Sequence, residues 1–286
     1  MKKIRIAIGK TPISKLFLAN ETSPLNLLHQ PVIPIHHAFR PMVEKMAFDV
    51  SELAIVTAIQ AVEQNTNIVP LPITISARDQ HRCIIQNRKF TNLKPGDLEG
   101  RRVAVRAFSQ TTGAWVRTIL DTEYGVDCTK IKWITQEASH VTGAPEPSTV
   151  VRAAGGASPL ELIRQGTVDA AIFGNDLPDE SWAKPIIVNP DKAGKTSLKA
   201  SGIIQINHII AVSRPFFEQR QNDVRMIMQG FSAARRQLSK YEQRMLPAGQ
   251  EEMQESVEKL VGSLLRQGLI NRKFRFQDIF GDSMSL

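Results

Sequence analysis

Short apolar runs alternate with segments of helical period along most of this chain. The apolar runs carry many β-branched residues, which is typical of strands buried in a sheet, and they span residues 4–8, 32–35, 68–75, 83–86, 102–106, 168–173 and 202–212. Apolar residues recur at helical spacing from near residue 14 and over residues 39–46, 55–63, 114–124, 159–165, 216–241 and 251–268. Residues 136–156 and 176–199 lack a period and predict loops. Strands that alternate with helices predict an α/β fold with a mostly parallel sheet.

The clearest strand–turn–helix unit lies between residues 98 and 133. The hydroxyl-rich turn Ser109-Gln110-Thr111-Thr112-Gly113 follows a predicted strand and precedes a helix that Gly125 ends. The first N–H groups of such a helix lack internal partners and carry partial positive charge, so the turn can bind a carboxylate or phosphate. The alternative is that Thr111 or Thr112 simply caps the helix.

The pattern also predicts two lobes, because each half of the α/β alternation is complete in itself. Single extended segments near residues 83–86 and 202–212 would connect them, giving a first lobe of residues 1–87 plus 205–286 and a second of residues 88–204. Ligands bind at the carboxyl ends of strands and in clefts between domains. Candidate residues at those ends are Thr11, His36, His37, Ser51, Glu52, Arg78, His81, Arg82, Ser109, Thr111, Thr112, Asn207 and His208.

Charge and cysteine content narrow the class of ligand. The 286 residues include 36 Lys and Arg against 28 Asp and Glu, a net charge of +8, but no block of basic residues. Dispersed charge argues against nucleic acid binding and suits a small anionic ligand. Cys83 and Cys128 form no CxxC motif and are expected as reduced thiols, and no residue set has metal-ligand spacing. The N-terminus lacks a signal-peptide core and no segment reaches membrane-spanning length, which predicts a cytoplasmic protein, although a periplasmic protein without its leader would look similar.

Several phrases resemble the 4,5-dihydroxyphthalate decarboxylase-like branch of the type II periplasmic-binding-protein fold. They are FDVSELA (48–54), LPI with ISARDQH (71–81), LEGRRVAV (98–105), TTGAWVRTILDTEYGVD (111–127), IKW (131–133), QGTVDAAI (165–172) and SGIIQINHIIAVSR (201–214). The resemblance implies a two-lobe α/β fold with a ligand cleft, and a cytoplasmic enzyme that removes one carboxylate from a hydroxylated aromatic diacid without metal or cofactor. The chain departs from the pattern at Ala77 and Gln80, where the family tends to carry arginines, and at Arg106, where proline is usual.

Such a reaction needs anchors for the acid groups, a proton donor and a group that polarises a phenol. Histidine suits general acid work, so the expected catalytic residues are His81, His208 and Glu52, with Glu52 accepting from a ring hydroxyl. Arginine clamps carboxylates bidentately. The expected substrate-binding residues are Thr11, Ser51, Arg78, Arg82, Ser109, Thr111, Thr112 and Asn207, with Ser51 also a natural helix cap.

Each assignment has a structural alternative. His81 and His208 can be satisfied core histidines, and Arg78 and Arg82 beside Asp79 can form a surface ion-pair cluster. We expect His36 and His37 at the surface and assign no role to His140. The alternative function is a solute-binding protein of an ABC-type uptake system that holds a small carboxylate without chemistry, because the fold is shared. A regulator is disfavoured, since no helix-turn-helix precedes the first strand. No membrane insertion is expected, and the sequence leaves homo-oligomerisation open.

Overall fold

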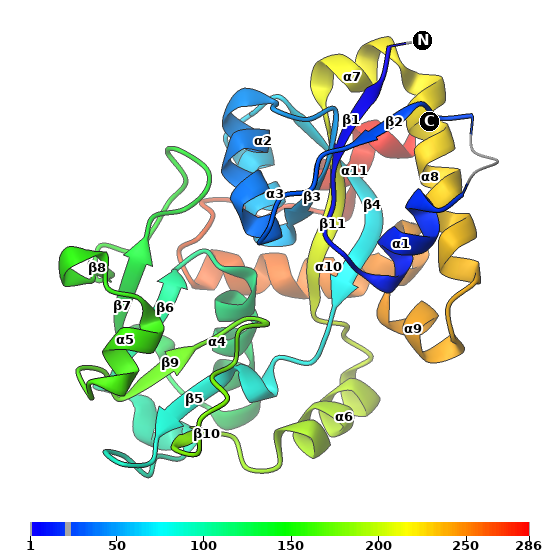
Figure 1. Cartoon of the computed structure of the whole chain (residues 1–286). Coiled ribbons are helices and arrows are strands. Elements are labelled where there is room, and N and C mark those ends of the chain that lie inside the picture. The colour runs from blue at the N-terminus through cyan, green and yellow to red at the C-terminus, as the bar shows by residue number, and fades with distance from the viewer. Residues whose placement is uncertain (1, 21–23, 286) are drawn as a thin grey trace.

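The computed structural model describes residues 2–20 and 24–285, which fold around two β-sheets (Figure 1). The first sheet has the order β2 (Leu27–His29), β1 (Ile4–Ala7), β3 (Val50–Ala54), β11 (Ile206–Ser213), β4 (Ile68–Ala77). The second has the order β10 (Ala183–Pro185), β5 (Ile84–Asn87), β9 (Ala170–Ile172), β6 (Arg102–Ala107), β7 (Lys132–Glu137), β8 (Val151–Arg152). β11 pairs antiparallel with β3 and β4, and β5 antiparallel with β9 and β10, whereas the other pairs are parallel. The predicted α/β fold is confirmed, with mixed sheets.

Helices cover both faces of each sheet. One face of the first sheet packs on α1 (Pro12–Leu18), α7 (Arg214–Gln219) and α8 (Gln221–Arg236), which α9 (Lys240–Met245) follows. The other face packs on α2 (Phe39–Lys45), α3 (Ile55–Glu63), α10 (Gly249–Arg266) and α11 (Phe276–Met284). The second sheet packs between α4 (Thr111–Tyr124) and α5 (Pro159–Arg164). A single apolar cluster joins α3, α4, α10 and both sheets, so the two halves share a core. Each fully buried large apolar side chain in it contributes about 1.5–3 kcal/mol.

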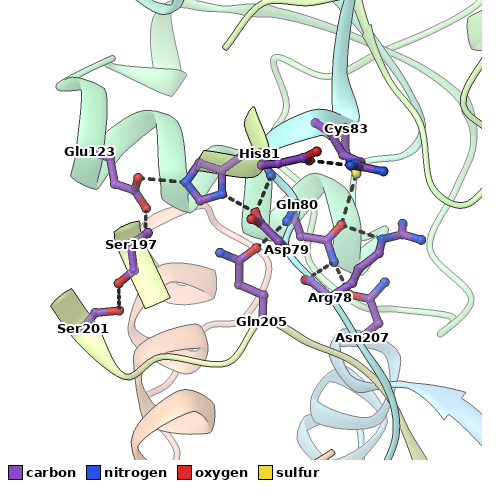
Figure 2. A network of polar contacts seen from close by, with 12 residues as sticks. Arg78, Asp79, Gln80, His81, Cys83, Glu123, Ser197, Ser201, Gln205 and Asn207 are labelled. Atoms are coloured by element: carbon purple, nitrogen blue, oxygen red, sulfur yellow. Dashed lines mark hydrogen bonds and ion pairs between the residues drawn. The ribbon is translucent and has the colours of Figure 1, made fainter. Parts of the chain in front are cut away.

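Two segments connect the sheets, and they are hydrogen-bonded to each other. The chain leaves β4 through the short helix η2 (His81–Cys83) and returns to β11 after α6 (Pro190–Ser201). The amide of Gln80 donates to Gln205 Oε1 at 2.7 Å, and the Gln80 side chain donates to the side chain of Asn207. Both crossings are therefore held side by side, as Figure 2 shows. The lobe boundaries at residues 87/88 and 204/205 stay a prediction.

Three local expectations were wrong. Residues 32–35 form no strand, because Pro31 and Pro34 lack the N–H groups that a sheet needs, and the short helix η1 (Ile35–Ala38) begins there instead. Residues 190–201 form α6 and not a loop. Gly194 is its only buried residue, and Ala193 and Leu198 are the side chains of this helix that pack against the core, so its apolar face is narrow.

The third error concerns the start of α3. Ser51 and Glu52 lie inside β3 and do not open the helix, whose N-cap is Ala54 without a side-chain hydrogen bond. Ser51 is fully buried, and its hydroxyl donates to the Glu52 carbonyl oxygen at 2.8 Å. Ser51 is therefore neither the predicted cap nor exposed to a ligand.

Candidate functional site

A cleft of about 370 Å³ lies where the carboxyl ends of β6, β7 and β9 face the first sheet. Five of the predicted binding residues line it, together with one predicted catalytic histidine: Arg78, Ser109, Thr111, Thr112, Asn207 and His208. Strand ends that meet at one sheet edge bring these separate segments together. The cleft is therefore the candidate functional site.

The N-terminus of α4 opens into this cleft without a cap. Its N-cap residue is Gln110, whose side chain makes no capping hydrogen bond, and its first turn carries no acidic residue. Thr111 Oγ1 instead accepts from the Val56 amide at 3.4 Å, and Thr112 Oγ1 lies 3.5 Å from an Arg78 guanidinium nitrogen. The capping alternative for Thr111 and Thr112 is thus wrong, and the helix terminus can receive an anion.

Arg78 and Asn207 face the cleft from the two crossing segments. The Arg78 guanidinium reaches both Thr112 and Gln80, whose side-chain oxygen lies 3.4 Å from Arg78 Nε. Asn207 is buried and accepts from the Gln80 amide group. Because Gln80 touches both residues, it holds them in place at the junction of the sheets (Figure 2). A fixed guanidinium beside a helix N-terminus is a strong carboxylate site.

Glu52 orients His208 from the neighbouring strand. Glu52 is 2% exposed, and its Oε1 lies 2.6 Å from His208 Nδ1. Its other oxygen, Oε2, accepts from the Gly9 amide at 2.7 Å. A Cβ atom at Gly9 would stand 3.1 Å from Oε2, so the absent side chain allows this approach. The carboxylate contacts Nδ1 and leaves Nε2 of His208 for the cleft. Glu52 itself does not line the cleft, so it cannot accept from a ring hydroxyl as expected.

His81 does not lie in the cleft. Its imidazole is fully buried between Asp79 and Glu123, with Nδ1 2.5 Å from Asp79 Oδ1 and Nε2 2.9 Å from Glu123 Oε2 (Figure 2). Burial alone would lower the pKa of His81, but the two hydrogen-bonded carboxylates outweigh it and raise the pKa to about 9. Both ring nitrogens are occupied, so His81 joins the crossing segment to α4 and has no free nitrogen for a substrate.

Two further predicted binding residues have other partners. Arg82 is half-exposed and pairs with Asp191 at the start of α6. Thr11 is the N-cap of α1, where its hydroxyl accepts from the Ser14 amide at 3.2 Å. Neither lines the cleft, and nor does Ser51 inside β3. Arg78 lines the cleft and Arg82 does not, a difference that the sequence spacing did not reveal.

The cleft also contains residues that sequence reasoning did not select: Ile35, His36, Phe39, Arg106, Gln110, Gln136, His140, Ser158, Asn175 and Asp176. His36 was expected at the surface and His140 was not assigned. Both follow parallel strands, β2 and β7, whose carboxyl ends point to the cleft. The same kind of position placed His36 among the strand-end candidates of the sequence, and it could have identified His140 as well.

Other classes of site find little support in the part of the chain that is described. Within residues 2–20 and 24–285, no group of three His, Cys, Asp or Glu side chains has metal-binding geometry. Cys83 and Cys128 are free thiols, and burial raises the pKa of Cys83 to about 11. The helices of this same part include none that is both long and apolar enough to cross a bilayer.

The chain is similar to known proteins in sequence and in structure. No protein-family model matches the chain. The chain is 24% identical over 209 residues to 4,5-dihydroxyphthalate decarboxylase of Comamonas testosteroni, a match that covers 68% of this chain and 62% of that protein's length. Among solved structures, the alkanesulfonate-binding protein SsuA of Xanthomonas axonopodis pv. citri, bound to MOPS, has a TM-score of 0.60 at 11% identity, covering 97% of both chains. The periplasmic aliphatic sulphonate-binding protein SsuA of Escherichia coli has a TM-score of 0.56 at 12% identity, covering 98% of this chain and 99% of that one.

The chain has a type II periplasmic-binding-protein fold. The desulfurization enzyme DSZB shares it, with a TM-score of 0.58 at 11% identity over 100% of this chain and 99% of its own. Binding proteins and an enzyme thus have the same fold, so the fold alone does not assign chemistry. The expected resemblance to the decarboxylase is confirmed as a distant sequence similarity.

Proposed function

We propose that this protein is a carboxy-lyase that releases CO2 from a hydroxylated aromatic dicarboxylate similar to 4,5-dihydroxyphthalate. The observation that carries the proposal is the Glu52–His208 pair, which presents an oriented histidine to a cleft that also holds Arg78 and the N-terminus of α4. An anion site needs only the arginine and the helix. A histidine backed by a buried carboxylate adds what a proton transfer needs. The distant decarboxylase relative supports the same reaction class.

Each of these residues has its own role in the proposed reaction. Arg78, Thr112 and the α4 N-terminus bind the carboxylate that the ring retains, since tight pairing of the departing carboxylate would stabilise the ground state. His208 transfers a proton from Nε2 to the ring carbon that bears the departing carboxylate, while a ring hydroxyl shares its electrons. The carbon–carbon bond then breaks, its electron pair restores the aromatic ring, and CO2 leaves. Glu52 holds the imidazole in the orientation that the transfer needs.

A solute-binding role is the second candidate. The observation that favours it is the uncapped α4 terminus beside Arg78, which forms an anion site with or without chemistry. The similar sulfonate-binding proteins carry the same fold. The cytoplasmic location and the oligomeric state stay predictions, and one similar protein is named as periplasmic.

The two candidates are separated by assaying 4,5-dihydroxyphthalate for CO2 release and for its effect on melting temperature. The carboxy-lyase releases CO2, and His208→Gln abolishes the release while binding persists. If the protein is a binding protein, the compound raises the melting temperature, and neither the wild type nor His208→Gln releases CO2.

A further inference from the structure

Three imidazoles line the cleft, and the proposed reaction uses only one of them. Besides His208, these are His36 in η1 and His140 after β7. The ring of Phe39 packs edge-on against His140 and His208, at centroid distances of 5.6 and 5.2 Å. The two unused histidines come from segments that follow strands of different sheets, β2 and β7, and both line the same cavity.

The imidazole of His36 has no hydrogen-bond partner within residues 2–20 and 24–285, and the residue is half-buried. The His140 ring, by contrast, has a partner, because its Nδ1 lies 3.2 Å from Thr57 Oγ1. Burial, and after it the charge of Arg106, lower the pKa of His36 to about 4 and that of His140 to about 3. Both rings are neutral near pH 7, so each can offer a nitrogen as acceptor.

Arg106 adds an incompletely paired charge to this wall. Its Nε lies 3.2 Å from Glu137 Oε1, yet neither atom has a hydrogen-bond partner in the described part of the chain. Burial lowers the pKa of Arg106. A partly buried guanidinium whose Nε lacks a hydrogen-bond partner favours a ligand oxygen that carries or gains negative charge.

A phenolic hydroxyl fits this wall better than a carboxylate does. Its O–H can donate to a neutral imidazole, and its oxygen gains negative charge as the ring is protonated elsewhere. We infer that His36, backed by Arg106, binds a ring hydroxyl of the ligand and sets the preference for hydroxylated over unsubstituted aromatic diacids. The inference rests on the proposed function, because it assigns the hydroxyl-binding wall of the same cleft.

The test compares two ligands that differ only in hydroxyl groups, 4,5-dihydroxyphthalate and phthalate, by isothermal titration calorimetry in the His208→Gln background, which binds without releasing CO2. The protein that retains His36 binds the dihydroxy compound about tenfold more tightly, the contribution of one hydrogen bond (~1.4 kcal/mol). His36→Leu removes that difference and leaves phthalate affinity unchanged, and His36→Gln restores most of it. His37→Leu is the matched control, because His37 is the exposed neighbour and does not line the cleft.

The outcomes separate the two proposals. If the His208→Gln protein that retains His36 binds both diacids equally, or if adding His36→Leu weakens both equally, His36 does not recognise a hydroxyl and the inference is overturned while the anion site stands. If neither diacid binds, the proposed function fails and the inference fails with it. Melting curves of the variants verify that each is folded.

Discussion

Glu52 Oε1 lies 2.6 Å from His208 Nδ1, across the pairing of β3 with β11. The register of these antiparallel strands sets Ile210 opposite Glu52 and His208 opposite Ala54, so the two side chains are diagonal neighbours on one face. A carboxylate at this distance fixes the orientation of the imidazole. The pair joins the core of the first sheet to the cleft.

Replacing the Glu52 carboxylate should lower the catalytic rate much more than the affinity for substrate. Glu52→Gln keeps the size of the side chain but removes the carboxylate that orients the His208 imidazole, so kcat should fall roughly 100-fold while KM stays nearly constant. Steady-state CO2 release measures both constants. Glu123→Gln alters a similar carboxylate–histidine contact outside the cleft and should leave kcat nearly unchanged. Equal losses in the two variants would contradict the role of Glu52.

The two arginines near the crossing should behave differently. Arg78 lines the cleft, whereas Arg82 is half-exposed and pairs with Asp191. Arg78→Met should weaken diacid binding roughly 10- to 100-fold, because a hydrogen bond to a charged group contributes about 1.5–3 kcal/mol. Arg82→Met should change it less than twofold. Calorimetric measurement of diacid affinity for the two variants tests this prediction. A larger effect at Arg82 would mean that the anion site lies outside this cleft.

His81 should matter for stability and not for turnover. Its ring is buried, but Asp79 and Glu123 keep about a third of their side-chain surface in solvent (36% and 30%). Removing the imidazolium leaves two facing carboxylates, and His81→Gln should lower the free energy of unfolding by about 2 kcal/mol, below the range for fully buried pairs. Urea unfolding measures this change. A fully stable variant that has lost CO2 release would restore the original catalytic assignment of His81.

The same residue gives the stability a pH dependence. The folded-state pKa of His81 is raised from 6.5 to about 9, so the folded protein binds a proton that the unfolded chain releases. This stabilisation is complete below about pH 6.5 and is lost as the pH rises through about 9. The difference in unfolding free energy between the wild type and His81→Gln should therefore shrink between pH 6.5 and 9.5. A difference that grows over this pH range would contradict the raised pKa of His81.

Helix α6 is held against the crossing segment at Gly194. A Cβ atom there would lie 1.1 Å from Asp79 Oδ2, so Gly194→Ala must displace Asp79 from His81 or move the helix. We expect it to lower the melting temperature by several degrees, the effect of about 1–3 kcal/mol of overpacking. Gly281→Ala in α11 is the control, since nothing lies within 4 Å of its added Cβ atom. That variant should be neutral or slightly more stable.

The sequence predicted local elements well and long-range neighbours poorly. The strand, turn and helix around Thr111 follow from apolar period, hydroxyl content and Gly125, and the structure has all three. His208 was selected because it lies near a predicted crossing between the lobes, in a phrase that resembles the decarboxylase-like family. Its contact with Glu52 depends on the register of β3 against β11, which lie far apart in the sequence.

The errors have a similar physical cause. The direction of His81 is set by η2, a turn too short to show a period, and by Glu123 on a distant helix. His36 and His140 lie outside any periodic segment, where only the carboxyl ends of β2 and β7 indicate a site. The helix α6 has a polar surface that the sequence does not distinguish from a loop.

The most direct test of the account is to incubate the protein with 4,5-dihydroxyphthalate in D2O and analyse the product by mass spectrometry and NMR. Proton transfer from His208, whose Nε2 exchanges with solvent, predicts CO2 together with a dihydroxybenzoate that carries one deuterium at the vacated ring carbon. His208→Gln should form neither. Recovery of the unchanged diacid after binding to the wild-type protein would contradict the carboxy-lyase and leave the solute-binding function.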